Sequence, residues 1–165
     1  LTMNRFAVSR RLFLLSSAVS VLPRAALANT QPWKAQFIGG GFDGAKYTLA
    51  LHVQMDANWK TYWRVPGSGG IPPSIQITGQ NLLSFRVDLP APKRIPGEEG
   101  DSIGYKDEVL FPIEILPLDV MKPLTLQANA FIGVCDTICI PVPIEQALDL
   151  QPIAASNASD ALIAE

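Results

Sequence analysis

Short runs in which apolar and polar positions alternate follow one another along most of the chain. In the clearest run, residues 47–55, every odd position is apolar, and the even positions are Thr48, Ala50, His52 and Gln54. This period of two predicts a strand with one buried face, and we expect His52 to be solvated on the other face. Further strands are predicted at residues 34–39, 60–64, 74–78, 83–89, 109–116, 124–134 and 142–150.

Glycine and proline separate these runs, and helical periodicity is scarce. Turn-forming residues cluster at 39–41, 66–70, 72–73, 96–97 and 100–101. About eight short strands with such spacing predict an all-β domain, built as a two-sheet sandwich of immunoglobulin type. The sequence shows no internal repeat and no sign of a second domain.

The first 28 residues have the pattern of a cleavable export signal. Arginines are followed by an apolar run from 12 to 22, and Ala26-Leu27-Ala28 predicts cleavage after Ala28. An uncleaved anchor is the alternative, but this run is shorter than the ~20 residues that span a bilayer.

Adjacent arginines at 10 and 11 also resemble a twin-arginine signal, and Arg24 before the cleavage site is typical of that route. An ordinary secretion signal that carries two neighbouring arginines is the other interpretation. Both routes lead out of a bacterial cytoplasm, so we expect a periplasmic protein in a compartment where disulfides persist.

Residues 29–153 are predicted to form the domain, and the small polar residues 154–165 a flexible tail. Removal of the signal takes four arginines, which leaves 9 basic and 15 acidic residues and a formal charge of −6. This balance argues against nucleic acid and anionic membrane surfaces as partners. No other apolar run approaches membrane length, so we expect no membrane span in the mature chain.

Cys135 and Cys139 are the only cysteines of the chain. In a continuous strand they would lie ~13 Å apart, whereas a disulfide requires Cα atoms within about 7 Å. If they pair, the chain must reverse between them, and Asp136 and Thr137 are suitable turn residues. Prolines at 141 and 143 indicate that the following strand is an edge strand or begins there.

The spacing alone leaves a structural bridge and a redox couple equally open. A five-residue ring stabilises by only ~2 kcal/mol in the chain-entropy model, and small rings tend to be reducible. Against a reactive thiol, the nearest charge in sequence is Asp136, and no cationic residue lies within ten positions on either side. These thiols would exchange slowly unless the fold brings a cation to them.

Metal binding is a third chemical option. Two cysteines and a distant His52 do not supply the ligands of a zinc site. Two thiolates at Cys135 and Cys139 suffice for the soft ion Cu(I). Met55 and Met121 are expected to be core residues rather than extra ligands.

Four segments in order resemble one family over nearly the whole mature chain. They are Asn-Trp-Lys-Thr-Tyr-Trp-Arg-Val-Pro-Gly at 58–67, Leu-Pro-Ala-Pro-Lys-Arg at 89–94, Gly-Tyr-Lys-Asp-Glu-Val-Leu-Phe-Pro at 104–112, and Cys-Asp-Thr-Ile-Cys-Ile-Pro at 135–141. Together they resemble the periplasmic N-terminal domain of the thiol:disulfide interchange protein DsbD and its ScsB-like relatives.

The resemblance implies an immunoglobulin-like fold in which Cys135 and Cys139 relay electrons without a cofactor. It implies a protein-disulfide reductase, or an interchange component, that exchanges with thioredoxin-like periplasmic proteins. Cys139 is the cysteine expected to form the mixed disulfide. A non-enzymatic immunoglobulin-like binding module with a structural disulfide remains the alternative.

Two departures from DsbD change these expectations. DsbD spaces its cysteines more widely, so the Cys-x3-Cys pair is closer to the ScsB-like branch, which is linked to copper tolerance. The resemblance covers one domain, so a separate membrane electron donor of DsbD, ScsB or CcdA type is expected to reduce it.

Three residues are expected to line the site beside the cysteines, namely Tyr62, Arg64 and Asp136. Tyr62 and Arg64 share a predicted strand face, so Arg64 would lower a thiol pKa if it approached the pair. The stretch 66–73 is a candidate for the loop that shields the cysteines in DsbD. Trp59 and Trp63 are expected either in the core or on the docking surface.

Overall fold

A computed structural model describes residues 31–98 and 100–151, and this part of the chain is built from antiparallel strands. The strands are β1 Trp33–Phe42, β2 Tyr47–Met55, β3 Lys60–Gly67, β4 Ser74–Gln80, β5 Leu82–Val87, β6 Lys93–Ile95, β7 Ser102–Lys106, β8 Glu108–Pro117, β9 Leu124–Cys135 and β10 Cys139–Leu150.

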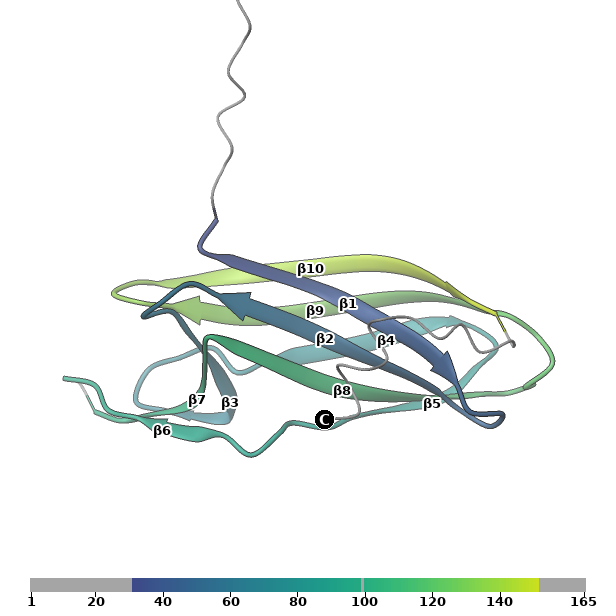
Figure 1. Cartoon of the computed structure of the whole chain (residues 1–165), viewed down its shortest axis with the longest axis horizontal. Helices are drawn as coiled ribbons and strands as arrows, with labels where there is room; N and C mark the ends of the chain where they lie inside the picture. Colours follow the sequence, from purple (N-terminus) through teal and green to yellow (C-terminus); the bar gives the residue numbers. More distant parts are fainter. Residues whose placement is uncertain (1–30, 99, 152–165) are drawn as a thin grey trace, which may run out of the picture. The chain divides into compact units, whose positions relative to one another are not determined.

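The strands of the described residues form two sheets (Figure 1). One sheet has the order β1-β2-β8-β5. The other has the order β10-β9-β3-β7-β6, and β4 pairs with β9 along residues 125–131, beside the point where β3 meets β9. The prediction of an all-β, immunoglobulin-like two-sheet sandwich is confirmed.

A single apolar core fills the space between the two sheets. It is supplied by alternate residues of β2 and β8 from one sheet and of β4 and β9 from the other, in agreement with the period-two pattern. The largest fully buried members are Tyr47, Leu49, Leu51, Phe111, Ile113, Ile115, Leu124 and Ile132.

The glycine triplet at 39–41 lies inside a strand, where the sequence predicted a turn. β1 continues to Phe42, and its register with β2 shifts between Gly39 and Gly41, which marks a β-bulge. Gly40 has φ +124°, a conformation that favours glycine. The turn follows instead at Asp43, whose carboxylate accepts hydrogen bonds from the backbone N–H groups of Ala45 and Lys46.

Two short strands, β6 and β7, lie in a region where the sequence predicted none. β7 contains Gly104, which has low strand propensity. A Cβ on Gly104 would lie 2.0 Å from the carbonyl oxygen of Thr61, so the glycine allows β7 to approach β3 closely. Residues 102–106 thus form a strand because they pair with β3 and β6, although their sequence pattern does not predict one.

His52 is buried, so the expectation that it is solvated was wrong. β2 lies between β1 and β8, and His52 is flanked by Gln36 on one side and Leu110 on the other. Its side chain contacts the carboxylate of Glu108 through Nε2. A residue on the outer face of a central strand is covered by its neighbours, which single-strand alternation does not reveal.

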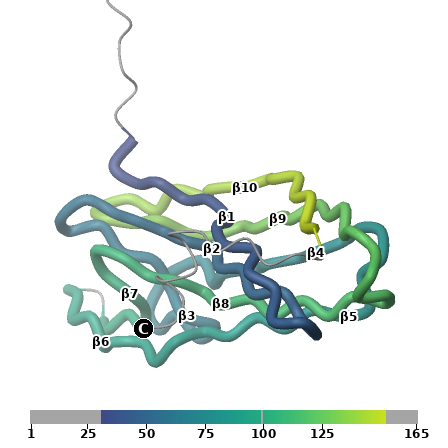
Figure 2. Tube along the Cα trace, turned by 45° about the vertical axis from the view of Figure 1, so that its right-hand side comes forward, coloured from purple at the N-terminus to yellow at the C-terminus, as the bar shows by residue number. Residues whose placement is uncertain are grey.

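The edges of the two sheets meet where β1 lies beside β10 (Figures 1 and 2). Gln146 of β10 joins them, because its Nε2 donates to the carbonyl of Phe37 at 3.0 Å and its Oε1 accepts from the Phe37 N–H at 3.1 Å. One side chain thus satisfies both backbone groups of an edge residue and closes the sandwich along this side.

Two predictions from the sequence fall outside the described residues. The export signal at 1–28 and the whole tail at 154–165 belong to the parts of the chain for which no structure is described. Among residues 31–98 and 100–151, no helix has the length and apolar character that a membrane crossing requires.

The Gln146 contact predicts a stability effect. Replacing Gln146 with alanine removes two hydrogen bonds to a partly buried backbone, which should cost about 1–2 kcal/mol and lower the melting temperature by roughly 4–10 °C. Thermal unfolding followed by circular dichroism measures this. Gln127→Ala on β9 is the matched control, because its side chain is exposed. Equal melting temperatures for the two variants would contradict the role of Gln146.

Candidate functional site

The two cysteines close the hairpin between β9 and β10. β9 ends at Cys135, β10 begins at Cys139, and the two residues are directly opposite each other in the ladder. Their Cα atoms lie 4.1 Å apart and the sulfurs form a disulfide. The chain reverses over residues 136–138, where the N–H of Asp136 donates to the carbonyl of Ile138 at 3.1 Å. The predicted chain reversal is confirmed.

The two sulfurs occupy different environments. Cys135 is 1% exposed, because β9 has β10 on one side and β3 on the other at this point. Cys139 is exposed, because β10 is the edge strand of its sheet. The prolines at 141 and 143 lie in this edge strand, as predicted, with Pro141 opposite Gly133 and Pro143 opposite Phe131.

β3 holds the inner side of the pair in place. Lys60 is directly opposite Cys135 across the ladder, on the side away from Cys139. The next residue, Thr61, is fully buried, and its hydroxyl donates to the carbonyl of Gly133 at 2.8 Å. This bond from a side chain to the backbone holds β3 against the end of β9, so the outward-facing residues of β3 lie beside the disulfide.

Tyr62 is the next outward-facing residue of β3, and it contacts the exposed cysteine. Its hydroxyl oxygen lies 3.6 Å from the Sγ of Cys139. Because this sulfur is in a disulfide and carries no hydrogen, the hydroxyl is the donor. Burial raises the pKa of the Tyr62 hydroxyl, so it stays protonated at neutral pH and keeps its donor.

A cavity of about 450 Å³ opens over the disulfide. Two loops form its rim. Ser68 of the first loop donates its N–H to the carbonyl of Asp101 in the second at 3.0 Å, and a Cβ on Gly100 would lie 2.4 Å from the Ser68 hydroxyl. The residues that line the cavity are Lys60, Tyr62, Ser68, Gly69, Gly70, Gly97, Glu98, Gly100, Ser102, Cys135, Asp136, Thr137 and Cys139.

Lys60 is the cation of this cavity among its described lining residues, and the acids are Glu98 and Asp136. Its ammonium donates to the hydroxyl of Ser102 at 3.1 Å and lies 5.9 Å from the centre of the Tyr62 ring. The sequence placed no cation within ten residues of the cysteines. The fold brings one in from β3, more than seventy residues earlier in the chain.

Of the three predicted lining residues, the structure brings Tyr62 and Asp136 to the cavity and leaves Arg64 outside it. The register of β3 against β7 shifts between Tyr62 and Gly67, so the alternation that relates Tyr62 to Arg64 is interrupted. Arg64 is exposed and lies over the ring of its neighbour Trp63, with the guanidinium carbon 4.2 Å from the ring centre. Trp59 and Trp63 pack against the core.

Sequence reasoning missed two parts of the site, namely Lys60 and the second loop. Lys60 precedes Tyr62 by two positions, so the alternation that placed Tyr62 on the outer face also indicated Lys60. Gly100 and Asp101 of the second loop had no such signal, because they meet Ser68 only in the folded chain. The first loop, residues 68–70, falls within the stretch 66–73 that was expected to lie over the cysteines.

The methionines considered for Cu(I) lie away from the disulfide cavity. Met55 belongs to the core, as expected, whereas Met121 is 79% exposed, so its assignment to the core was wrong. Met121 lies in the turn after β8, where chain connections rather than packing determine the side chain's position. In the described ranges 31–98 and 100–151, no group of three His, Cys, Asp or Glu residues has metal-site geometry.

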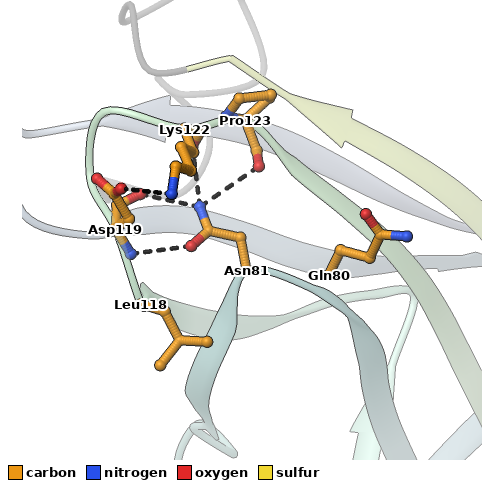
Figure 3. A pocket seen from close by; sticks show the side chains of 6 residues that line it. All are labelled: Gln80, Asn81, Leu118, Asp119, Lys122 and Pro123. Atoms are coloured by element: carbon orange, nitrogen blue, oxygen red, sulfur yellow. Dashed lines mark hydrogen bonds and ion pairs between the residues drawn. The ribbon is translucent and has the colours of Figure 1, made fainter.

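A second hollow lies near the other end of β9 (Figure 3). Asn81, with φ 63°, points into it and holds the loop after β8 in place. Its amide donates to the carbonyls of Asp119 and Lys122, and its oxygen accepts from the Asp119 N–H at 2.8 Å. The polar groups of Asn81 are therefore used in loop structure, and the ammonium of Lys122 pairs with the carboxylate of Asp119 at 3.1 Å.

Residues 26–151 match the family described as thiol:disulfide interchange protein DsbD, N-terminal. Among solved structures, the chain is similar to the N-terminal periplasmic domain of ScsB from Proteus mirabilis, with 25% identity and a TM-score of 0.64. This match covers 84% of the chain and 53% of the ScsB structure, so the chain spans about half of its length. No curated protein matches.

Gly70 provides a test of how the first loop covers the disulfide. Gly70 has φ +155°, and a Cβ there would lie 2.5 Å from the ring of Tyr62. We expect Gly70→Ala to displace the loop, to lower the free energy of unfolding by about 1–3 kcal/mol, and to speed reduction of the disulfide by dithiothreitol. Stopped-flow fluorescence and denaturant titration measure the two effects.

The matched control is Gly69→Ala in the same loop, where φ is +62° and carries backbone strain for alanine, but a Cβ meets no atom within 4 Å. We expect smaller changes in both measurements for this variant. If the disulfide of Gly70→Ala is reduced at the wild-type rate, the loop does not control access to the sulfurs.

Proposed function

Because the chain belongs to the family of DsbD N-terminal domains, as its motifs predicted, we propose that it is a thiol-disulfide exchange module. In this proposal the Cys135–Cys139 pair accepts two electrons from one protein and passes them to another. The observation that carries the proposal is the asymmetry of the pair. Cys139 is an exposed residue at a sheet edge, and Cys135 is buried behind it.

The asymmetry supports one order of bond changes. A partner thiolate attacks the exposed Sγ of Cys139, the Cys135–Cys139 bond breaks, and its electron pair leaves on Cys135 as a thiolate. The second thiolate of the partner then attacks the partner sulfur of this mixed disulfide and releases Cys139. The partner ends as a disulfide and the chain as a dithiol. The reverse sequence passes the two electrons to the next protein.

A structural staple is less well supported by the position of the bridge. Cys135 and Cys139 are already partners in the β9–β10 ladder, so the bridge constrains residues that backbone pairing holds together. The bridge closes only the short loop between Cys135 and Cys139. The chain-entropy model assigns the closure of such a ring a stabilisation of only ~2 kcal/mol. A bridge that joined the two sheets would stabilise the sandwich more.

The family and the neighbour support a proposal for the compartment and the partners. The ScsB structure is a periplasmic domain. We therefore infer that this chain works in the periplasm after export. A membrane protein of the DsbD, ScsB or CcdA type is proposed as its electron donor, and thioredoxin-like proteins as its acceptors. The cavity over Cys139 leaves its sulfur open to such a partner.

Replacing one cysteine at a time tests the exchange. The Cys135→Ser variant keeps the exposed Cys139 thiol without its resolving partner. We expect its thiolate to attack a thioredoxin whose single active-site cysteine is first converted to a mixed disulfide with thionitrobenzoate, to release thionitrobenzoate, and to remain bound as a stable mixed disulfide. The Cys139→Ser variant keeps a thiol that is 1% exposed, and we expect far less complex. Non-reducing electrophoresis and mass spectrometry identify the product.

The double variant lacking both cysteines controls for binding that is not covalent. The same variants are also incubated with a periplasmic extract, in which thioredoxin-like proteins are the expected catch. The proposal fails if neither single variant forms a mixed disulfide with the thioredoxin or with any protein of the extract.

A further inference from the structure

Lys60 is more buried than a polar residue on the outer face of a strand usually is. It is half-buried in the disulfide cavity, whereas a strand lysine normally extends its ammonium into water. It is directly opposite Cys135, and opposite residues on one sheet face have Cα atoms about 4.5–5.5 Å apart. Its ammonium is held over the cavity by Ser102, which is 3% exposed.

We propose that Lys60 stabilises the thiolate of Cys135, and so acts as an electrostatic positioning residue for thiol-disulfide exchange. This inference rests on the proposed function. When a partner attacks Cys139, negative charge develops on the Sγ of Cys135, a buried sulfur with little access to water. Lys60 and Cys135 line the same cavity, and a nearby cation favours the charged form of such a thiol and makes it a better leaving group.

The groups around Cys135 leave this role to Lys60. On β3, Tyr62 is neutral and its hydroxyl is directed to Cys139. Asp136 in the hairpin loop and Glu98 in the rim loop are both exposed. Their negative charges would disfavour the thiolate form of Cys135. Arg64 lies outside the cavity over Trp63. Among the described residues that line the cavity, Lys60 is the group whose charge favours the thiolate.

In this proposal, two residues of β3 act on different sulfurs of the pair. Tyr62 donates a hydrogen bond to Cys139, the sulfur that receives the attack. Lys60 is the neighbour of Cys135, the sulfur that leaves. The two-residue spacing on β3 puts both side chains on the same face of the sheet, with the hydroxyl of Ser102 on β7 behind the ammonium.

The test measures thiol pKa values in the reduced protein. Alkylation rates with iodoacetamide are recorded as a function of pH, on a Cys139→Ser background so that only Cys135 reacts. We expect Lys60→Gln and Lys60→Met to raise the Cys135 pKa by about one unit, a roughly tenfold loss of thiolate below that pKa. Lys60→Arg should keep the wild-type value within a few tenths, because it keeps the charge.

Lys106 provides the matched control. It is the partner of Lys60 on β7, in the same row of the sheet, but it is exposed and does not line the cavity. We expect Lys106→Gln to leave the Cys135 pKa unchanged. Circular dichroism melting verifies that each variant is folded, and two neutral replacements of Lys60 guard against one that is not.

In the protein with both cysteines, the rate of disulfide reduction by dithiothreitol at pH 7 gives a second readout. We expect it to fall several-fold in Lys60→Gln, because a leaving thiol of higher pKa leaves more slowly. An unchanged Cys135 pKa in both neutral variants would overturn the inference, as would an equal shift in Lys106→Gln. Neither result affects the trapping experiment, so the inference can fail while the proposed function stands.

Discussion

The antiparallel ladder between β9 and β10 is the constraint on which the site depends. It runs without a register shift from the Leu124–Leu150 pair to the Cys135–Cys139 pair. A slip of one residue would turn each side chain of β10 to the other face of the sheet and separate the two sulfurs. The core residues of β10, Val142 and Leu150, make such a slip costly because they would leave the apolar core. Packing far from the cysteines therefore fixes their pairing.

Sheet order then gives the two sulfurs their different properties. β10 is an edge strand, and its prolines need no ladder partner on the outer side. β9 is an inner strand, and the bond from Thr61 to Gly133 brings β3 against its end. The exposed sulfur and the buried sulfur are thus consequences of strand position. The same contact between β3 and β9 places Lys60 opposite Cys135 and Tyr62 against Cys139. The Thr61 hydrogen bond therefore helps to position both side chains beside the disulfide.

The strand pattern of the sequence predicted much of this architecture, and it failed where pairing overrides local preference. Tyr47–Met55 alternates clearly and forms a strand with the predicted bounds. Ser102–Lys106 contains Gly104 and a lysine and forms a strand only because β3 and β6 flank it. The burial of His52 follows from the neighbours of β2, and the exposure of Met121 from a loop. Neither can be obtained from one strand considered alone.

For the site, local spacing predicted the chain reversal between the cysteines and the outward direction of Tyr62. It could not predict which strand lies beside Cys135, because the pairing of Lys60 with Cys135 spans the sequence between the third and ninth strands. The electrostatics of the thiols depend on that pairing. A sequence in which the nearest charge is Asp136 thus folds into a site in which a lysine is the cross-strand neighbour of the buried sulfur.

The reduction potential of the Cys135–Cys139 pair tests the central claim most directly. It is obtained by equilibrating the protein with glutathione buffers of known ratio and quantifying the two redox forms. An exchange module should have a value in the range of thiol-disulfide exchange proteins, about −120 to −270 mV. A value below about −300 mV, typical of structural disulfides, would contradict the account and identify the bridge as a staple.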